Sequence, residues 1–169
     1  MKNMKRTLLL CAMLAPVVSL AGTKDAAKLA FEKMKTLVGK WSGTMGSGKD
    51  AMPATVEYRL TGSGSALVET LGAGSPYEMI SVYHLDGNDL VMTHYCGAGN
   101  QPSMKLKSGK DGNVLFFDFY RGSNMKLTDM HMHSVTFKFD GKDHVIANWV
   151  SYANGKPGEP AAFDFHRVK

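Results

Sequence analysis

The 169-residue sequence predicts an all-β protein: an antiparallel up-and-down β-barrel of about nine or ten strands, preceded by one N-terminal helix. Three observations support this prediction. Short runs of alternating or β-branched residues recur along the chain, glycine-rich turn sequences separate them, and no helical apolar period appears after residue 39. Consecutive strands without helical crossovers pair as antiparallel neighbours in a barrel or a sandwich. We favour the barrel, because closing the sheet removes its exposed edges.

The first residues have the pattern of a secretory signal peptide. Lys2, Lys5 and Arg6 precede an apolar segment that ends in Ser-Leu-Ala. This segment is shorter than the roughly 18 apolar residues that a membrane-spanning helix needs. We therefore expect a signal peptide over 1–21, a single domain over 22–169 without a transmembrane segment, and a periplasmic or secreted location.

Charge and cysteine content narrow the classes of partner. Three of the 20 Lys and Arg residues lie within 1–21, so subtracting them lowers the formal charge from +5 to +2. Because the chain also has no Lys/Arg-rich run, we expect no nucleic-acid partner. Only Cys96 remains beyond the expected signal peptide, so we expect no internal disulfide.

Residues 23–39 form the expected helix. Thr23 or Asp25 can cap its start, and Gly39 can end it. The mostly apolar stripe that recurs with the helical period consists of Ala26, Leu29, Ala30, Lys33, Met34, Leu37 and Val38.

The expected strands follow in order and are separated by turn sequences. Two Asp-Gly turns, at Asp86-Gly87 and Asp140-Gly141, are close enough to their flanking runs to close hairpins. The expected strand ranges are 55–60, 66–71, 77–85, 90–96, 104–107, 114–120, 131–139, 145–152 and 163–168.

A Gly-x-Trp motif follows the helix directly, in the stretch Gly39-Lys40-Trp41-Ser42-Gly43. A helix leading into Gly-x-Trp and a long β meander resembles the lipocalin-like (calycin) barrels. The resemblance implies that Trp41 packs across the closed end of the barrel, with Arg167 from the last strand over its indole. Gly39, Trp41 and Arg167 are therefore expected to be structural residues.

Two longer stretches extend the resemblance. "VYHLDGNDLVMTHYCGAGNQPSM" and "HMHSVTFKF…NWVSYANGKPGEPAAFDFHRVK" resemble a family of secreted bacterial lipocalin-like proteins without an assigned activity. A more distant likeness is to nitrobindin-type haem-binding barrels, which implies a histidine ligand near the C-terminus. His166 is the candidate, but its alternation with Phe163 and Phe165 predicts that it faces outward.

Histidines and a cysteine fall on strand faces that we expect to line the barrel. His131 and His133 alternate with Val135, Phe137 and Phe139, and His94 and Cys96 alternate with Leu90 and Met92. The residues expected to contact a ligand are His131, His133, His94, Cys96, Met92 and Phe137.

These residues favour a secreted barrel that binds a small apolar or amphipathic molecule in its interior. One alternative is a metal- or haem-binding barrel, with His131, His133 and His94 as metal ligands. A second alternative is a packed, non-catalytic barrel that acts as an interaction module. We expect no enzyme, because a hydrolase built on Cys96 and His94 would need an oxyanion hole that the sequence does not indicate. The sequence identifies neither a cofactor nor an oligomeric state.

Overall fold

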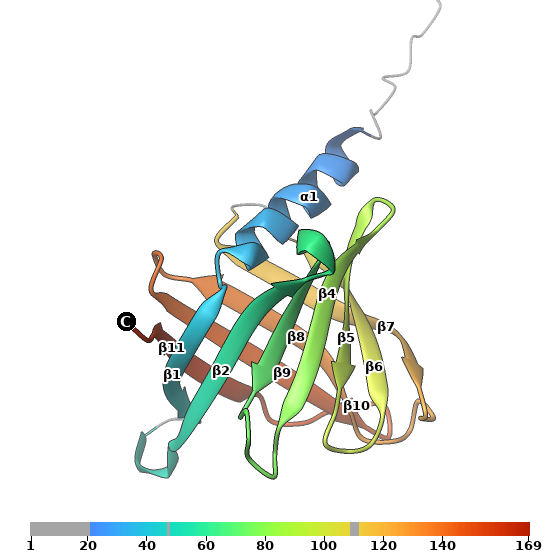
Figure 1. Ribbon diagram of the computed structural model, residues 1–169. Coiled ribbons are helices and arrows are strands. Elements are labelled where there is room, and N and C mark those ends of the chain that lie inside the picture. Colours follow the sequence, from blue (N-terminus) through green and yellow to red (C-terminus); the bar gives the residue numbers. More distant parts are fainter. Residues whose placement is uncertain (1–20, 47, 109–111) are drawn as a thin grey trace, which may run out of the picture.

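The computed structural model describes residues 21–46, 48–108 and 112–169, and it shows a barrel with one helix at its end (Figure 1). The expected signal peptide lies outside these residues except for Ala21, where the helix begins. The elements are α1 (Ala21–Lys35), β1 (Gly39–Met45), η1 (Gly48–Asp50), β2 (Met52–Thr61), η2 (Gly62–Gly64), β3 (Ala66–Leu71), β4 (Met79–Asp86), β5 (Asp89–Tyr95), β6 (Gln101–Ser108), β7 (Val114–Ser123), β8 (His131–Phe139), β9 (His144–Ala153), β10 (Lys156–Pro157) and β11 (Ala161–Arg167).

Antiparallel pairing closes the sheet completely. Each strand from β1 to β9 pairs with the next, β9 pairs with β11, and β11 pairs with β1. The two-residue β10 pairs with β9 beside this ring. The predicted fold class is therefore confirmed: the nine expected strands and the Gly-x-Trp strand β1 form a ten-stranded up-and-down barrel.

The helix ends earlier than the sequence predicted. It stops at Lys35 rather than at Gly39, because the backbone N–H groups of Thr36, Leu37 and Val38 donate to carbonyls three residues back. This tighter bonding ends the α-helical pattern. Gly39 instead begins β1, with a φ of 127° that favours glycine.

The buried stripe of the helix is also rotated from the predicted one. Of the expected stripe, Ala26 and Leu29 are exposed, as is Val38 in the turn beyond the helix. The prediction was wrong on Ala26 and Leu29 because the face that the helix buries depends on how it meets the barrel end, and wrong on Val38 because the helix ends before it. The residues that pack onto the end of the barrel are Ala27, Ala30, Phe31, Met34 and Leu37.

Trp41 and Arg167 connect the first and the last strand of the barrel, beside the helix. They are cross-strand partners on β1 and β11, and the guanidinium lies 4.2 Å from the centroid of the buried indole. Arg167 also donates to the carbonyls of Thr36 (2.7 Å) and Val38 (2.8 Å), and the Trp41 indole donates to the Leu37 carbonyl. One side chain therefore stabilises both the sheet closure and the helix-to-strand turn.

Replacing Arg167 with lysine should lower the free energy of unfolding by about 1–2 kcal/mol, since an ammonium cannot make this planar set of contacts. Chemical denaturation measures the change. Arg59→Lys, at an exposed position of β2, is the matched control. Equal effects of the two substitutions would contradict the stabilising role of the Arg167 contacts.

The middle of the barrel is filled by side chains. Tyr83, Phe117 and Phe137 are fully buried and meet edge to face, with ring centroids 5.8–6.2 Å apart. Together with the helix, this packing fills one end and the centre of the lumen. Among the described residues, no helix combines the length and apolar character required to cross a membrane.

Candidate functional site

A cavity of about 680 Å³ opens at the end of the barrel that lies away from α1. It sits where β1 ends and β2 begins, beside the turn from β3 to β4 (Figure 1). Most of its wall is apolar, and three of the lining residues that the structure describes carry a hydroxyl group: Thr55, Ser75 and Tyr77. The lining residues are Met45, Met52, Pro53, Ala54, Thr55, Leu71, Gly72, Ala73, Ser75, Tyr77, Met79 and Phe163.

The depth of the cavity follows from the strand alternation. Leu71 on β3 and Met79 on β4 are cross-strand partners and line the cavity. Two residues further into the barrel on the same faces lie Glu69 and Ser81, which are also cross-strand partners. Because two strand residues span roughly 7 Å, these two polar residues form the next layer beneath the cavity.

A row of polar side chains crosses four neighbouring strands at this depth. Tyr58 pairs with Glu69, Glu69 with Ser81, and Ser81 with His94, on β2, β3, β4 and β5 respectively. All four are buried. We call Tyr58, Glu69, Ser81 and His94 the lumen row.

Glu69 is a buried carboxyl group inside the barrel. The Tyr83 hydroxyl, from the layer below, donates to its Oε2 at 2.5 Å. Burial raises the pKa of Glu69 from 4.5 to about 7, while the hydrogen bond from Tyr83 opposes part of that shift. Burial likewise raises the pKa values of Tyr58 and Tyr83, and the Glu69 charge adds to both shifts. Below pH 7 the Glu69 side chain is therefore mostly a neutral carboxylic acid.

His94 is the other titratable group of the lumen row. Its Nδ1 lies 3.0 Å from the Ser81 hydroxyl, and its ring contacts the Trp149 ring at a centroid distance of 4.9 Å. Among the described residues, its buried Nε2 has no hydrogen-bond partner. Burial lowers the pKa of His94 from 6.5 to about 4, so its imidazole is neutral at physiological pH.

His131 and His133 form a separate cluster at the start of β8. Met132 pairs with Ser151 and Ser134 with Val150, which leaves His133 as an extra residue in a bulge. The alternation from the later part of β8 therefore does not continue unchanged to His131. The His131 side chain is nevertheless buried, against Phe119 and His133.

When both rings are neutral, the hydrogen bonds of this cluster determine the tautomers of both histidines. His131 Nδ1 lies 2.8 Å from the Asp129 carbonyl, which only accepts, so Nδ1 carries the proton. His131 Nε2 then accepts from His133 Nδ1 at 3.1 Å. Both nitrogens of His131 are occupied, and only His133 Nε2, 3.8 Å from an Asp118 oxygen, has a free lone pair. Burial lowers the pKa of His133, whose ring stacks on Tyr152 at 3.9 Å.

The structure thus places the predicted ligand contacts in different surroundings, and none of the six lines the cavity. Met92 and Phe137 belong to the packed core, and His94 lies in the lumen row. Cys96 is half-buried in the loop after β5, where its Sγ accepts from the Ala98 N–H.

The three predicted metal ligands do not come together at one point. His131 and His133 are hydrogen-bonded to each other, whereas His94 contacts Ser81 and Trp149. Within the described part of the chain, a different group meets the distance requirement for three metal ligands: His144, Asp164 and His166. The His166 side chain is 66% exposed, so it lies away from the lumen.

Glu69 and the two tyrosines of the lumen did not emerge from the sequence as site residues. Alternation along the sequence places most acidic residues in turns or on outer strand positions, as for Glu57. The available signal was the position of Glu69 between Leu67 and Leu71, two apolar residues of the same strand face. A carboxyl group in such an alternation indicates an interior acid.

In comparisons with known proteins, no family model and no curated sequence matches the chain. The closed ten-stranded antiparallel barrel is consistent with a lipocalin-like barrel.

Proposed function

We propose that this protein is a non-catalytic, exported binding protein that holds a small apolar or amphipathic molecule in the mouth of its barrel. The observation that supports this most directly is the cavity of about 680 Å³ with a predominantly apolar wall. Its volume falls within the range of roughly 300–1,000 Å³ that is typical of small-molecule sites. The resemblance to secreted calycin barrels and the predicted signal peptide support the same function and location.

The layers of the barrel favour an amphipathic ligand over a purely apolar one. Met45, Leu71, Met79 and Phe163 offer apolar surface at the mouth, and hydrophobic burial favours a hydrocarbon or ring system there. Ser75, in the turn between β3 and β4, can orient a polar group of the ligand. A permanently charged group is disfavoured near the lumen row, because its acid and its imidazole are both mostly neutral between about pH 4 and pH 7.

Native mass spectrometry of protein exported by its own signal tests the proposal directly. A retained organic molecule appears as added mass that organic extraction removes. Extracted protein should then bind an environment-sensitive apolar dye such as anilinonaphthalene sulfonate with saturation. Absence of both a retained molecule and saturable dye binding would favour the packed interaction module instead.

Filling the cavity should abolish most of this binding. Ala54→Phe places a ring in the apolar wall, and we expect the dissociation constant of the dye to rise by about tenfold or more. Ala153→Phe makes the same change at an exposed position of β9 and should leave binding unchanged. Circular dichroism checks that both variants are folded. Unchanged binding in Ala54→Phe would place the dye elsewhere and contradict the proposed site.

A further inference from the structure

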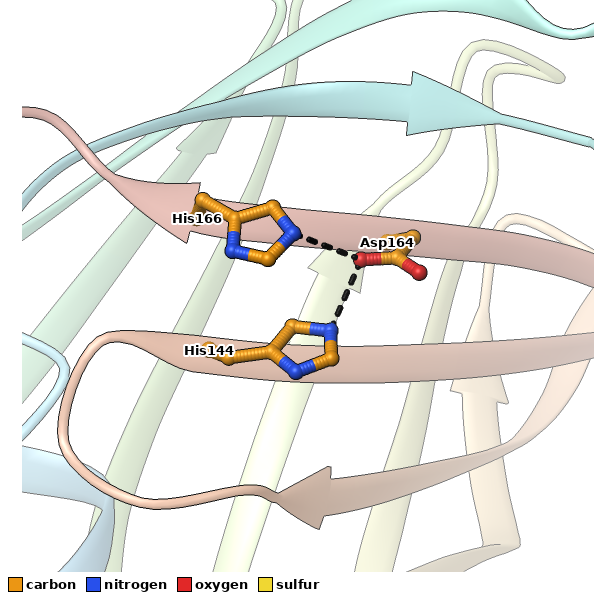
Figure 2. A group of neighbouring side chains, drawn as sticks. All are labelled: His144, Asp164 and His166. Carbon is orange, nitrogen blue, oxygen red and sulfur yellow. Dashed lines mark hydrogen bonds and ion pairs between the residues drawn. The ribbon is translucent and has the colours of Figure 1, made fainter.

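Two histidines and an aspartate meet on the outer wall of the barrel, away from the cavity. His144 on β9 and His166 on β11 are direct cross-strand partners, and Asp164 precedes His166 by two residues on the same strand face. Figure 2 shows both imidazoles directed at one oxygen of Asp164. The pairing of two sheet strands, rather than a loop, therefore holds the group together.

The distances are those of a nearly assembled ligand set. His144 Nε2 lies 2.8 Å and His166 Nε2 3.5 Å from Asp164 Oδ1, and one ligand atom from each residue falls within 4.8 Å of the others. The two rings are parallel, with centroids 4.4 Å apart. Metal–ligand bonds of about 2.0–2.2 Å require the two rings to tilt out of this parallel arrangement, so that both Nε2 lone pairs meet at one point.

A second carboxylate orients one of the histidines. Asp140, in the turn between β8 and β9, lies with Oδ2 3.2 Å from His144 Nδ1. When Nδ1 donates to this carboxylate, the Nε2 of a neutral His144 presents its lone pair to Asp164. A carboxylate on the far nitrogen of a ligating histidine is the usual support in metal sites.

We propose that His144, Asp164 and His166 bind a divalent transition-metal ion, with Zn²⁺ as the ion that fits best. Two imidazole nitrogens and one carboxylate oxygen form a donor set suited to Zn²⁺, and Asp140 is the positioning residue. His166 and Asp164 are 66% and 49% exposed, so water can complete the coordination. The site bridges β9 and β11, and it does not depend on the function proposed for the cavity.

The bridge predicts that zinc stabilises the folded chain. A ligand that binds only the native state raises the free energy of unfolding, and here the ligands come from two adjacent strands. Mg²⁺ and Ca²⁺ prefer sets of oxygen ligands and should not reproduce the effect.

Isothermal titration of the full chain, produced without a polyhistidine tag and stripped with EDTA, tests the proposal with ZnCl₂. We expect one ion per chain and a rise in the thermal midpoint of unfolding. Asp140→Ala should weaken affinity by about 10- to 100-fold, and His144→Ala, His166→Ala and Asp164→Asn should each weaken it further. His84→Ala, which removes an exposed histidine of β4, and His133→Ala should bind like the parent chain.

Four outcomes would overturn the proposal. One is the absence of saturable zinc binding, and another is parent-like affinity in Asp164→Asn together with His166→Ala. The third is equal stabilisation by Mg²⁺, which would indicate nonspecific attraction to Asp140 and Asp164. Loss of binding in His133→Ala alone would assign the ion to the β8 bulge and thereby also refute it.

Discussion

Replacing Gly43 with alanine is expected to lower the free energy of unfolding by about 3 kcal/mol, through overpacking between two backbones. Gly43 lies in the middle of β1, opposite Phe165 of β11. A Cβ atom at this position would overlap the carbonyl oxygen of Asp164 and lie 2.8 Å from its carbonyl carbon. Because the obstacle is backbone, relief requires β1 and β11 to separate at the pair that closes the barrel.

Gly97→Ala is the matched control for this prediction. Gly97 also lacks a positive φ, and a Cβ there would meet only the Met79 sulfur at 3.8 Å, an ordinary contact. Urea denaturation of the two variants measures the difference in unfolding free energy. A similar small effect in both would mean that the two strands adapt without loss and that the closure is looser than its geometry indicates.

The fold could be predicted largely because local and global signals agree along most of the chain. Alternation of apolar and polar residues specifies strands such as 131–139, and Asp-Gly turns specify hairpins. Both signals are local and do not depend on distant contacts. The helix shows the limit of this reasoning. Its buried face depends on how the helix meets the barrel end, and that contact selected Ala27 and Phe31 over Leu29.

The candidate site was less predictable, for two physical reasons. The bulge at His133 shifts the alternation by one residue, and a single sequence does not indicate where such an extra residue lies. The neighbours of His94 depend on strand register, which brings Ser81 beside it and Glu69 one strand further. Alternation predicts which residues share a face, whereas pairing determines which of them meet.

Glu69 and His94 should give the folding stability opposite dependences on pH. The pKa of Glu69 rises from 4.5 to about 7 on folding, so its contribution to stability is present below pH 4.5 and is lost as pH rises to about 7. The pKa of His94 falls from 6.5 to about 4, so its contribution is present above pH 6.5 and is lost as pH falls to about 4. Each change amounts to about 3 kcal/mol.

In the parent chain the pH dependences of these two contributions to stability nearly cancel between about pH 4.5 and 6.5. Glu69→Gln removes the acid, so stability should then increase with pH across this window because of His94. His94→Gln should show the reverse, a stability that decreases with rising pH because of Glu69. Urea denaturation at a series of pH values measures both slopes, and any constant packing loss leaves the slopes unchanged.

Glu57→Gln on β2 provides the control. Glu57 is next to Tyr58 in the strand, so its side chain points to the opposite side of the sheet from Tyr58 and Glu69. Its pH dependence should follow that of the parent chain. If Glu69→Gln also follows the parent, Glu69 is ionised in the folded protein at pH 6. The floor of the cavity would then hold a negative charge, and a cationic ligand would fit it better than the uncharged amphipathic molecule proposed here. The slope of one variant therefore determines the charge of the ligand to be sought.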